Sequence, residues 1–316
     1  MEYLILIVSL VGIVFGADFL VAGAVSIARK FKVSDFVIGA AIVGVGTSMP
    51  ELVVSFIGAV NGNADVAIGN VVGSNIFNVL GILGLTAVLF PVAVDKKNMR
   101  FEIPLCIGVS VLLTLLVFNF FNGASATIGR VDGVILLLLF AFFMWFSFRR
   151  DRKDAPVEES AQEDATPLWK AILKVVGGLA LLITSCDFFV DNAVLIAKSF
   201  GVNDAFISLT LIACGTSLPE LATCIVAARK GRNQMALGNV IGSNIANILL
   251  IVGGAALISP LSLTSIAWVD FAVMMVASLV LLMSAYTIKR DRIDRREGLL
   301  FIVIEVAYMI WLFLNA

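Results

Sequence analysis

The sequence predicts an all-α integral membrane protein of ten transmembrane helices, arranged as two inverted repeats of five helices each. Three observations predict this fold: an apolar composition, a series of apolar segments of spanning length, and a motif that occurs twice. Hydrophobic residues make up 60% of the 316 residues, charged residues make up 14%, and the mean hydropathy is +1.04. A soluble domain cannot carry that much apolar surface, so we expect most of the chain to lie in the lipid bilayer.

The candidate spans are apolar segments bounded by charged residues or by Gly, Asn and Asp clusters. A helix needs about 20 residues to cross the hydrocarbon core. Helices are expected because open strands would leave backbone groups unpaired in lipid. The first segment has no small-residue cleavage site, so it is interpreted as a span. In chain order, we expect spans at 2–28, 35–60, 66–90, 101–121, 131–148, 168–198, 205–227, 236–258, 267–287 and 298–315.

The basic residues support this count. With these spans, all of the 22 Lys and Arg residues except Arg130 and Lys198 fall on one side of the membrane. Positive charge gathers on the cytoplasmic side, so we expect a plasma (inner) membrane protein with both termini outside. The only long hydrophilic stretch, 149–167, is expected to be a cytoplasmic linker between a first repeat at 1–148 and a second at 168–316.

The two halves repeat at a fixed offset of 169 residues. Residues 46–52 read Gly-Thr-Ser-Met-Pro-Glu-Leu, and residues 215–221 differ from them by a single Met/Leu exchange. The Gly-Asn-Val and Gly-Ser-Asn-Ile stretches at 69–76 recur at the same offset. Since five spans is an odd number, the second half must enter the membrane from the opposite side. Inverted repeats are typical of secondary transporters, whose sites lie at the midplane between the repeats.

Each motif places an ionisable Glu beside a Pro within an apolar span. Pro50 has no N–H, so the Gly46 carbonyl lacks its usual helical partner, and Thr47 and Glu51 share one helix face. Carboxylate, carbonyl and hydroxyl oxygens suit hard cations such as calcium and sodium. The second motif repeats this patch with Thr216, Pro219 and Glu220.

The two glutamates are expected to bind cations. An ionised carboxylate at the bilayer centre costs about 3 kcal/mol, and no Lys or Arg lies near Glu51 or Glu220 in these spans. Protons, water or cations must offset the charge. Two carboxylates neutralise one divalent cation or leave room for more than one monovalent cation, so calcium and sodium would compete for the pair.

Further polar residues have weaker indications of function. Two stripes at i, i+4 and i+8 could supply oxygens to the site or only hydrogen-bond between helices. Asn75 and Asn244 lie off these stripes and are interpreted as structural, Asp18 and Asp187 as packing or capping residues, and Glu305 as incidental. The stripes are Asn70, Ser74 and Asn78, and Asn239, Ser243 and Asn247.

Other classes of site are disfavoured. The chain has no His, which excludes a histidine proton relay or a His-ligated metal, and its four Cys lack metal-ligand spacing. No nucleophile–base pair accompanies the glutamates, so we expect neither an enzyme nor a cofactor. A channel would not explain the inverted duplication, and no nucleic-acid partner is expected.

On these doubled motifs, and over nearly its whole length, the chain resembles the sodium/calcium exchanger family within the larger cation/calcium antiporter group. It is similar to compact prokaryotic members, because it lacks the large calcium-binding cytoplasmic loop of animal exchangers. The resemblance implies a monomer that exchanges Na⁺ for Ca²⁺ by alternating access, as the first and sixth spans slide against the remaining bundle.

The resemblance also implies roles for individual residues. Calcium would be held by Glu51 and Glu220 with the carbonyls of Thr47 and Thr216. Sodium sites would share the two carboxylates and add the two Thr hydroxyls, Ser74, Ser243, and the carbonyls of Gly44 and Ala213. Ser48 and Ser217 would line the pathway, and Asn78 and Asn247 would complete the central site.

One residue departs from the pattern of many relatives. Prokaryotic and potassium-dependent exchangers often have Asp where Asn247 stands. An Asn there favours potassium-independent exchange and leaves two central carboxylates. The alternatives are a calcium/proton antiporter, since a buried carboxylate can also bind a proton, and a potassium-dependent sodium/calcium antiporter.

Overall fold

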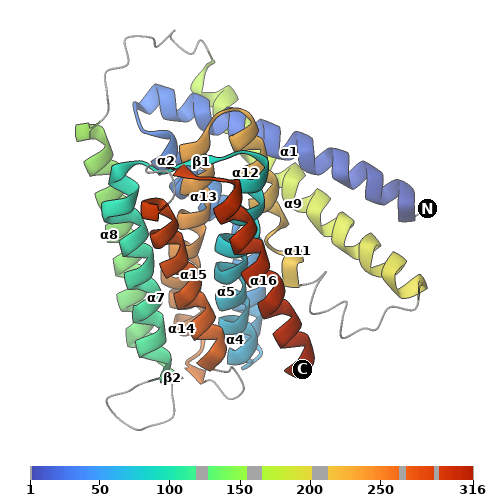
Figure 1. The fold of residues 1–316 in the computed structure, drawn as a ribbon, viewed down its shortest axis with the longest axis vertical. Coiled ribbons are helices and arrows are strands. Elements are labelled where there is room, and N and C mark those ends of the chain that lie inside the picture. The colour runs from blue at the N-terminus through green and yellow to red at the C-terminus, as the bar shows by residue number, and fades with distance from the viewer. Residues whose placement is uncertain are drawn as a thin grey trace.

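A computed structural model of the protein describes residues 2–118, 127–154, 166–200, 213–262, 268–287 and 292–315, and this part of the chain is almost entirely helical (Figure 1). Several helices change from α-helical to wider π-helical geometry, labelled η, within one span. The elements of the first half are α1 (Glu2–Phe31), α2 (Asp35–Ile38), η1 (Gly39–Gly44), α3 (Val45–Thr47), α4 (Met49–Val60), α5 (Ala64–Phe77), η2 (Asn78–Leu83), α6 (Gly84–Leu89), β1 (Val92–Ala93), η3 (Asn98–Glu102), α7 (Ile103–Phe118), β2 (Thr127–Ile128) and α8 (Arg130–Asp154). Those of the second half are α9 (Leu168–Ser199), α11 (Ala213–Gly215), α12 (Leu218–Arg229), α13 (Asn233–Ala246), η5 (Asn247–Val252), α14 (Gly253–Ile258), β3 (Leu261–Ser262), α15 (Trp268–Thr287), β4 (Arg292–Ile293) and α16 (Arg295–Asn315).

The described residues contain eight helices that are long and apolar enough to cross a membrane. A ninth candidate is the pair Asp35–Thr47 and Met49–Val60, which is bent by 48°. The expected span at 205–227 begins outside the described residues, and its described part is α11 and α12. The count of ten spans therefore stays a prediction. The expected linker at 149–167 begins as helix, because α8 continues to Asp154.

The sequence repeat extends to the elements themselves. The bounds of α4, α5, η2, α6 and β1 recur at an offset of 169 in α12, α13, η5, α14 and β3. The repeated strands lie in two small antiparallel sheets, β1 with β4 and β3 with β2. Figure 1 places β1 and β2 at opposite ends of the molecule, so the repeated strands β1 and β3 also lie at opposite ends.

Helices α1 and α9 pack along each other and extend together from the side of the bundle (Figure 1). Glycines allow their backbones to approach closely. A Cβ atom on Gly16 would lie 2.7 Å from the Leu182 nitrogen, and one on Gly178 would lie 2.5 Å from the Leu20 nitrogen. Small residues at helix crossings are typical of packing in membranes.

The centre of the bundle is formed by α13 and the elements around it. Every residue of α13 from Met235 to Ala246 is buried. This helix packs tightly against α2 and η1, since a Cβ atom on Gly238 would collide with the Phe36 carbonyl. The motif-bearing helix α12 also packs against α13, so the second motif lies in the protein interior.

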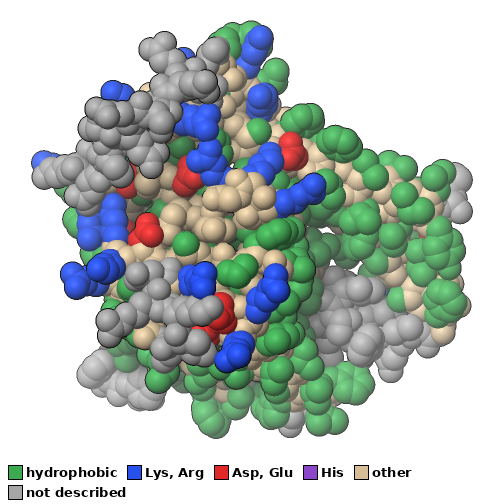
Figure 2. Space-filling model, turned by 45° about the horizontal axis from the view of Figure 1, so that its top comes forward, with side chains coloured by type: hydrophobic (Ala, Val, Ile, Leu, Met, Phe, Trp, Pro, Cys, Tyr) green, Lys and Arg blue, Asp and Glu red, His purple; other side chains and the backbone are tan. Residues whose placement is uncertain are grey.

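Basic side chains gather at one end of the molecule. Figure 2 shows Lys and Arg gathered over the end at the top of Figure 1, with hydrophobic side chains covering the flanks. This distribution suits a membrane protein, and the cytoplasmic orientation of the basic end stays a prediction.

The Asp18 carboxylate forms a 2.6 Å ion pair with Lys230, which differs from the expected packing or capping role. Asp187 is exposed in the middle of α9 and caps no helix end.

Candidate functional site

Both motifs break their helices at the same place. Helix α3 ends before Ser48 and α4 begins at Met49, while α12 begins after Ser217. Pro is tolerated in the first turn of a helix, because the N–H it lacks has no partner there. Glu51 and Glu220 therefore lie in the first turns of α4 and α12, where the helix dipole favours negative charge. Both are at most 1% exposed.

The two motifs meet through reciprocal hydrogen bonds. The Ser217 hydroxyl donates to Glu51 Oε1 at 2.9 Å, and the Ser48 hydroxyl donates to Glu220 Oε1 at 2.9 Å. The Ser74 hydroxyl adds a longer contact of 3.5 Å to Glu51 Oε1. Each glutamate is thus held by the serine of the other motif, and the two carboxylates lie in one buried site.

Five side-chain oxygens of the predicted site residues are buried and have no hydrogen-bond partner among the described residues. Such buried atoms are costly unless a donor or a cation satisfies them. Segment η2, which Asn78 begins, packs against α12, and η5, which Asn247 begins, packs against α4. Each of these Asn residues thus begins a segment that packs on the helix carrying the other repeat's glutamate. The unsatisfied oxygens are Glu51 Oε2, Glu220 Oε2, Asn78 Oδ1, Asn247 Oδ1 and Thr216 Oγ1.

Thr47 and Gly44, two other predicted site residues, have hydrogen-bond partners among the neighbouring elements. The Thr47 hydroxyl donates to the Val43 carbonyl at 2.9 Å and to Asn239 Oδ1 at 3.3 Å, and these partners differ from the expected Glu51. The Gly44 carbonyl accepts from the Ser243 hydroxyl at 3.1 Å and from the Ser48 N–H at 3.1 Å. Ala213 begins α11, four residues before Ser217, as Gly44 precedes Ser48 by four.

Asn70 and Asn239, the first residues of the two polar stripes, hydrogen-bond to the backbone carbonyls of the glutamates. Asn70 Nδ2 donates to the Glu51 carbonyl at 3.1 Å and to the Ser55 hydroxyl at 3.0 Å. Asn239 Nδ2 donates to the Glu220 carbonyl at 3.2 Å and to the Thr223 hydroxyl at 2.9 Å. Ser55 and Thr223 are not among the residues predicted from the sequence. Their positions, four and three residues after the glutamates on the same helix, are the signal that could have identified them.

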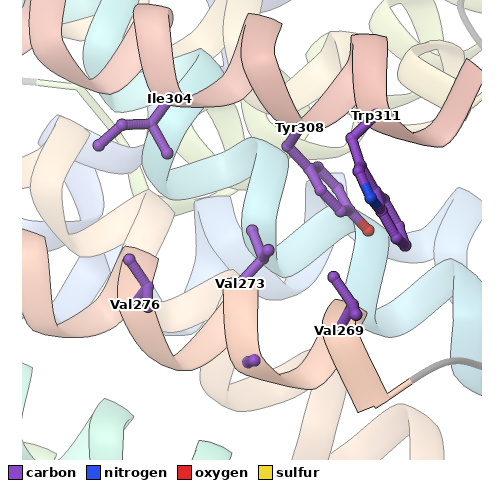
Figure 3. Close-up of a pocket in the computed structure, with 7 residues that line it drawn as sticks. Val269, Val273, Val276, Ile304, Tyr308 and Trp311 are labelled. Carbon is purple, nitrogen blue, oxygen red and sulfur yellow. The ribbon is translucent and has the colours of Figure 1, made fainter. Parts of the chain in front are cut away.

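Oxygen atoms are the ligands that this site offers to a cation. The described ranges contain no group of three His, Cys, Asp or Glu residues that could hold a metal ion. Figure 3 shows a separate groove between α15 and α16, lined by Val269, Ala272, Val273, Val276, Ile304, Tyr308 and Trp311. This groove is apolar, and the Tyr308 hydroxyl in it donates to Asp270 at 2.7 Å, so it does not resemble a cation site.

Comparison with known proteins gives consistent matches over the chain. The model of the family described as sodium/calcium exchanger protein matches residues 1–149 and 170–314. A putative antiporter, CaxA of Alkalimonas amylolytica, is 41% identical over 97% of both chains. The sodium/calcium exchanger MaX1 of Methanosarcina acetivorans is 32% identical, covering 99% of this chain and 98% of MaX1. A solved structure of the sodium-calcium exchanger NCX_Mj, soaked with 10 mM Na⁺ and zero Ca²⁺, aligns with a TM-score of 0.83 at 31% identity over 98% of each chain.

Proposed function

The chain belongs to the sodium/calcium exchanger family, and from this premise we propose that it exchanges Na⁺ for Ca²⁺ across the plasma membrane by alternating access at one midplane site. The site is built on Glu51 and Glu220. The reciprocal Ser217–Glu51 and Ser48–Glu220 hydrogen bonds carry this proposal, because they bring both carboxylates into one buried place. Two negative charges there match one Ca²⁺, and shared sites for Na⁺ make the two ions compete.

The neutral ligands of the proposed site are hydroxyl, carbonyl and amide oxygens of the residues around the carboxylates. In this proposal, Glu51 and Glu220 hold Ca²⁺ with the carbonyls of Thr47 and Thr216, and Asn78 and Asn247 complete the central site. Na⁺ binds the same carboxylates and recruits neighbouring hydroxyls and carbonyls. Serine hydroxyls that donate to a glutamate or to the Gly44 carbonyl can rotate and accept a cation instead. The recruited groups are the hydroxyls of Thr47, Thr216, Ser74 and Ser243 and the carbonyls of Gly44 and Ala213, with Ser48 and Ser217 lining the pathway.

The proposed architecture is a monomer of ten spans in two inverted repeats, with both termini outside and residues 149–167 in the cytoplasm. The repetition of α4 to α6 and β1 in the second half supports the inverted repeat. Alternating access is proposed to occur as α1 and α9 slide together against the bundle, and their close packing supports movement as a pair.

Calcium flux into membrane vesicles with separate ion gradients tests the proposed function. We expect Ca²⁺ uptake into vesicles loaded with Na⁺ and none into vesicles loaded with K⁺ or choline. Vesicles without the protein are the control. Uptake that persists without Na⁺ would contradict sodium coupling, and uptake driven by a proton gradient alone would favour the calcium/proton alternative. A requirement for K⁺ together with Na⁺ would favour the potassium-dependent alternative.

Acid is expected to inhibit this exchange. A protonated carboxyl group is neutral, so it cannot balance the charge of Ca²⁺, and protons therefore compete with cations at Glu51 and Glu220. As the pH falls, the Ca²⁺ concentration for half-maximal uptake should rise, while the maximal rate at saturating Ca²⁺ should change less. Initial rates of Na⁺-dependent uptake across a pH series measure both quantities. A flat profile would show that protons do not compete at the carboxylates.

A further inference from the structure

Asn75 and Asn244 connect the two repeats at the centre of the molecule. Asn75 Nδ2 donates to the Asn244 carbonyl at 3.2 Å, and Asn244 Nδ2 donates to the Asn75 carbonyl at 3.2 Å. Both side chains are at most 2% exposed. Each lies three residues before the asparagine, Asn78 or Asn247, that begins a π-helical segment.

These bonds fix which way the Asn75 and Asn244 amides face. A backbone carbonyl can only accept a hydrogen bond, so each side chain must turn its NH₂ group toward the other residue's carbonyl. Each must then present its oxygen on the opposite side of the amide. The nitrogen and oxygen of an amide side chain are easily exchanged when a structure is built. Here the two backbone carbonyls decide which atom faces them.

The fixed amides in turn orient Asn78 and Asn247. Asn244 Oδ1 accepts from Asn78 Nδ2 at 3.0 Å, and Asn75 Oδ1 accepts from Asn247 Nδ2 at 3.0 Å. An acceptor at this position requires the NH₂ group of its partner. The oxygens of Asn78 and Asn247 therefore face away from the bridge, and both are buried without a donor among the described residues.

We propose that Asn75 and Asn244 are positioning residues that hold the Asn247 and Asn78 amide oxygens toward the cation site and thereby set its cation affinity. This inference rests on the proposed function of that site. An amide oxygen attracts a cation and an NH₂ group repels it, so a single amide reversal converts a ligand into a repulsive group. In this proposal the pair acts through Asn78 and Asn247 and is not itself a ligand of the ion.

A double-mutant cycle tests the positioning role. Asn244→Leu removes the acceptor and frees the Asn78 amide to reverse. We expect it to raise the Ca²⁺ concentration for half-maximal effect about tenfold, as loss of a hydrogen-bonded arrangement around a charge does. Asn78→Asp removes the dependence on orientation, because both carboxylate atoms are oxygens. In a chain that already carries Asn78→Asp, adding Asn244→Leu is expected to change the half-maximal concentration less than about twofold.

The readout is the Ca²⁺-dependent or Na⁺-dependent increase in melting temperature of the purified chain, measured beside vesicle exchange. Ser284→Ala, which removes a buried hydroxyl that donates to the Leu281 carbonyl on α15, is the control for loss of a hydrogen bond elsewhere. Asn75→Leu with Asn247→Asp gives the symmetric cycle. The positioning role would be overturned if Asn244→Leu had equal effects with and without Asn78→Asp. It would also be overturned if Asn244→Leu left the half-maximal concentrations of both Ca²⁺ and Na⁺ unchanged. If the cycle behaves as expected while vesicles show no Na⁺-dependent Ca²⁺ exchange, the proposed function fails and the positioning role stands.

Discussion

Glu51→Gln and Glu220→Gln are each expected to lower Na⁺-dependent Ca²⁺ transport at least about 100-fold while the protein still folds. Gln is close to Glu in size and keeps one oxygen to accept the serine hydrogen bond that now reaches Glu51 Oε1 or Glu220 Oε1. It removes one of two negative charges, however, and replaces a free acceptor with an NH₂ group. A neutral side chain also costs less in the membrane interior than a carboxylate, so insertion should not suffer.

Initial rates of Ca²⁺ uptake into Na⁺-loaded vesicles measure this effect, normalised to the amount of folded protein. Glu305→Gln is the matched control, because Glu305 is also a buried carboxylate with an unsatisfied oxygen, lies on α16 and belongs to neither motif. We expect its rate to stay within about twofold of the unmodified chain. Normal transport by either Glu51→Gln or Glu220→Gln would contradict the proposal of a site built on both glutamates.

Gly178→Val is expected to lower the exchange rate at least about tenfold by separating α1 from α9. A Cβ atom at this position would lie 2.5 Å from the Leu20 nitrogen and 2.9 Å from the Gly16 carbonyl oxygen, closer than real Cβ atoms approach other heavy atoms. Both neighbours are backbone atoms of α1, so no side chain can rotate away and the two helices must move apart. Because the pair is proposed to slide as a unit, a changed crossing should impair the movement.

The adjacent residue supplies the control for this prediction. A Cβ atom on Gly177 meets no described atom within 4 Å, and Gly177→Val carries the same change in helix propensity. We expect the Gly177 variant to retain most of its exchange rate and its melting temperature. Equal losses in the two variants would show that the close approach at Gly178 does not matter for transport.

Much of the fold follows from periodic features of the chain. The 169-residue offset seen in the motif letters also relates the bounds of α4 and α12 and of α5 and α13. Pro50 and Pro219 mark where α4 and α12 begin, because proline fits the first turn of a helix. The bend of 48° between α3 and α4 follows from the same residue type, although the apolar pattern predicts 35–60 as one span.

The partners within the site were less predictable. The spacing of four residues places Thr47 and Glu51 on one helix face, yet the helix breaks between them and the Thr47 hydroxyl donates to the Val43 carbonyl. Periodicity describes one helix and cannot say which other helix will face it. The exchange of serines, Ser48 to Glu220 and Ser217 to Glu51, depends on how the repeats cross.

By itself, the sequence determined that this protein lies in a membrane, that its two halves are related, and that two carboxylates occupy corresponding positions in them. These properties depend on composition and spacing, which folding does not change. Only the tertiary structure decided that Asn75 and Asn244 join the repeats and turn the amides of Asn78 and Asn247. Spacing by i+4 assumes a regular α-helix, and the π-helical turns that begin at Asn78 and Asn247 change which residues share a face. Contacts between distant helices then select the partners, and no local pattern contains them.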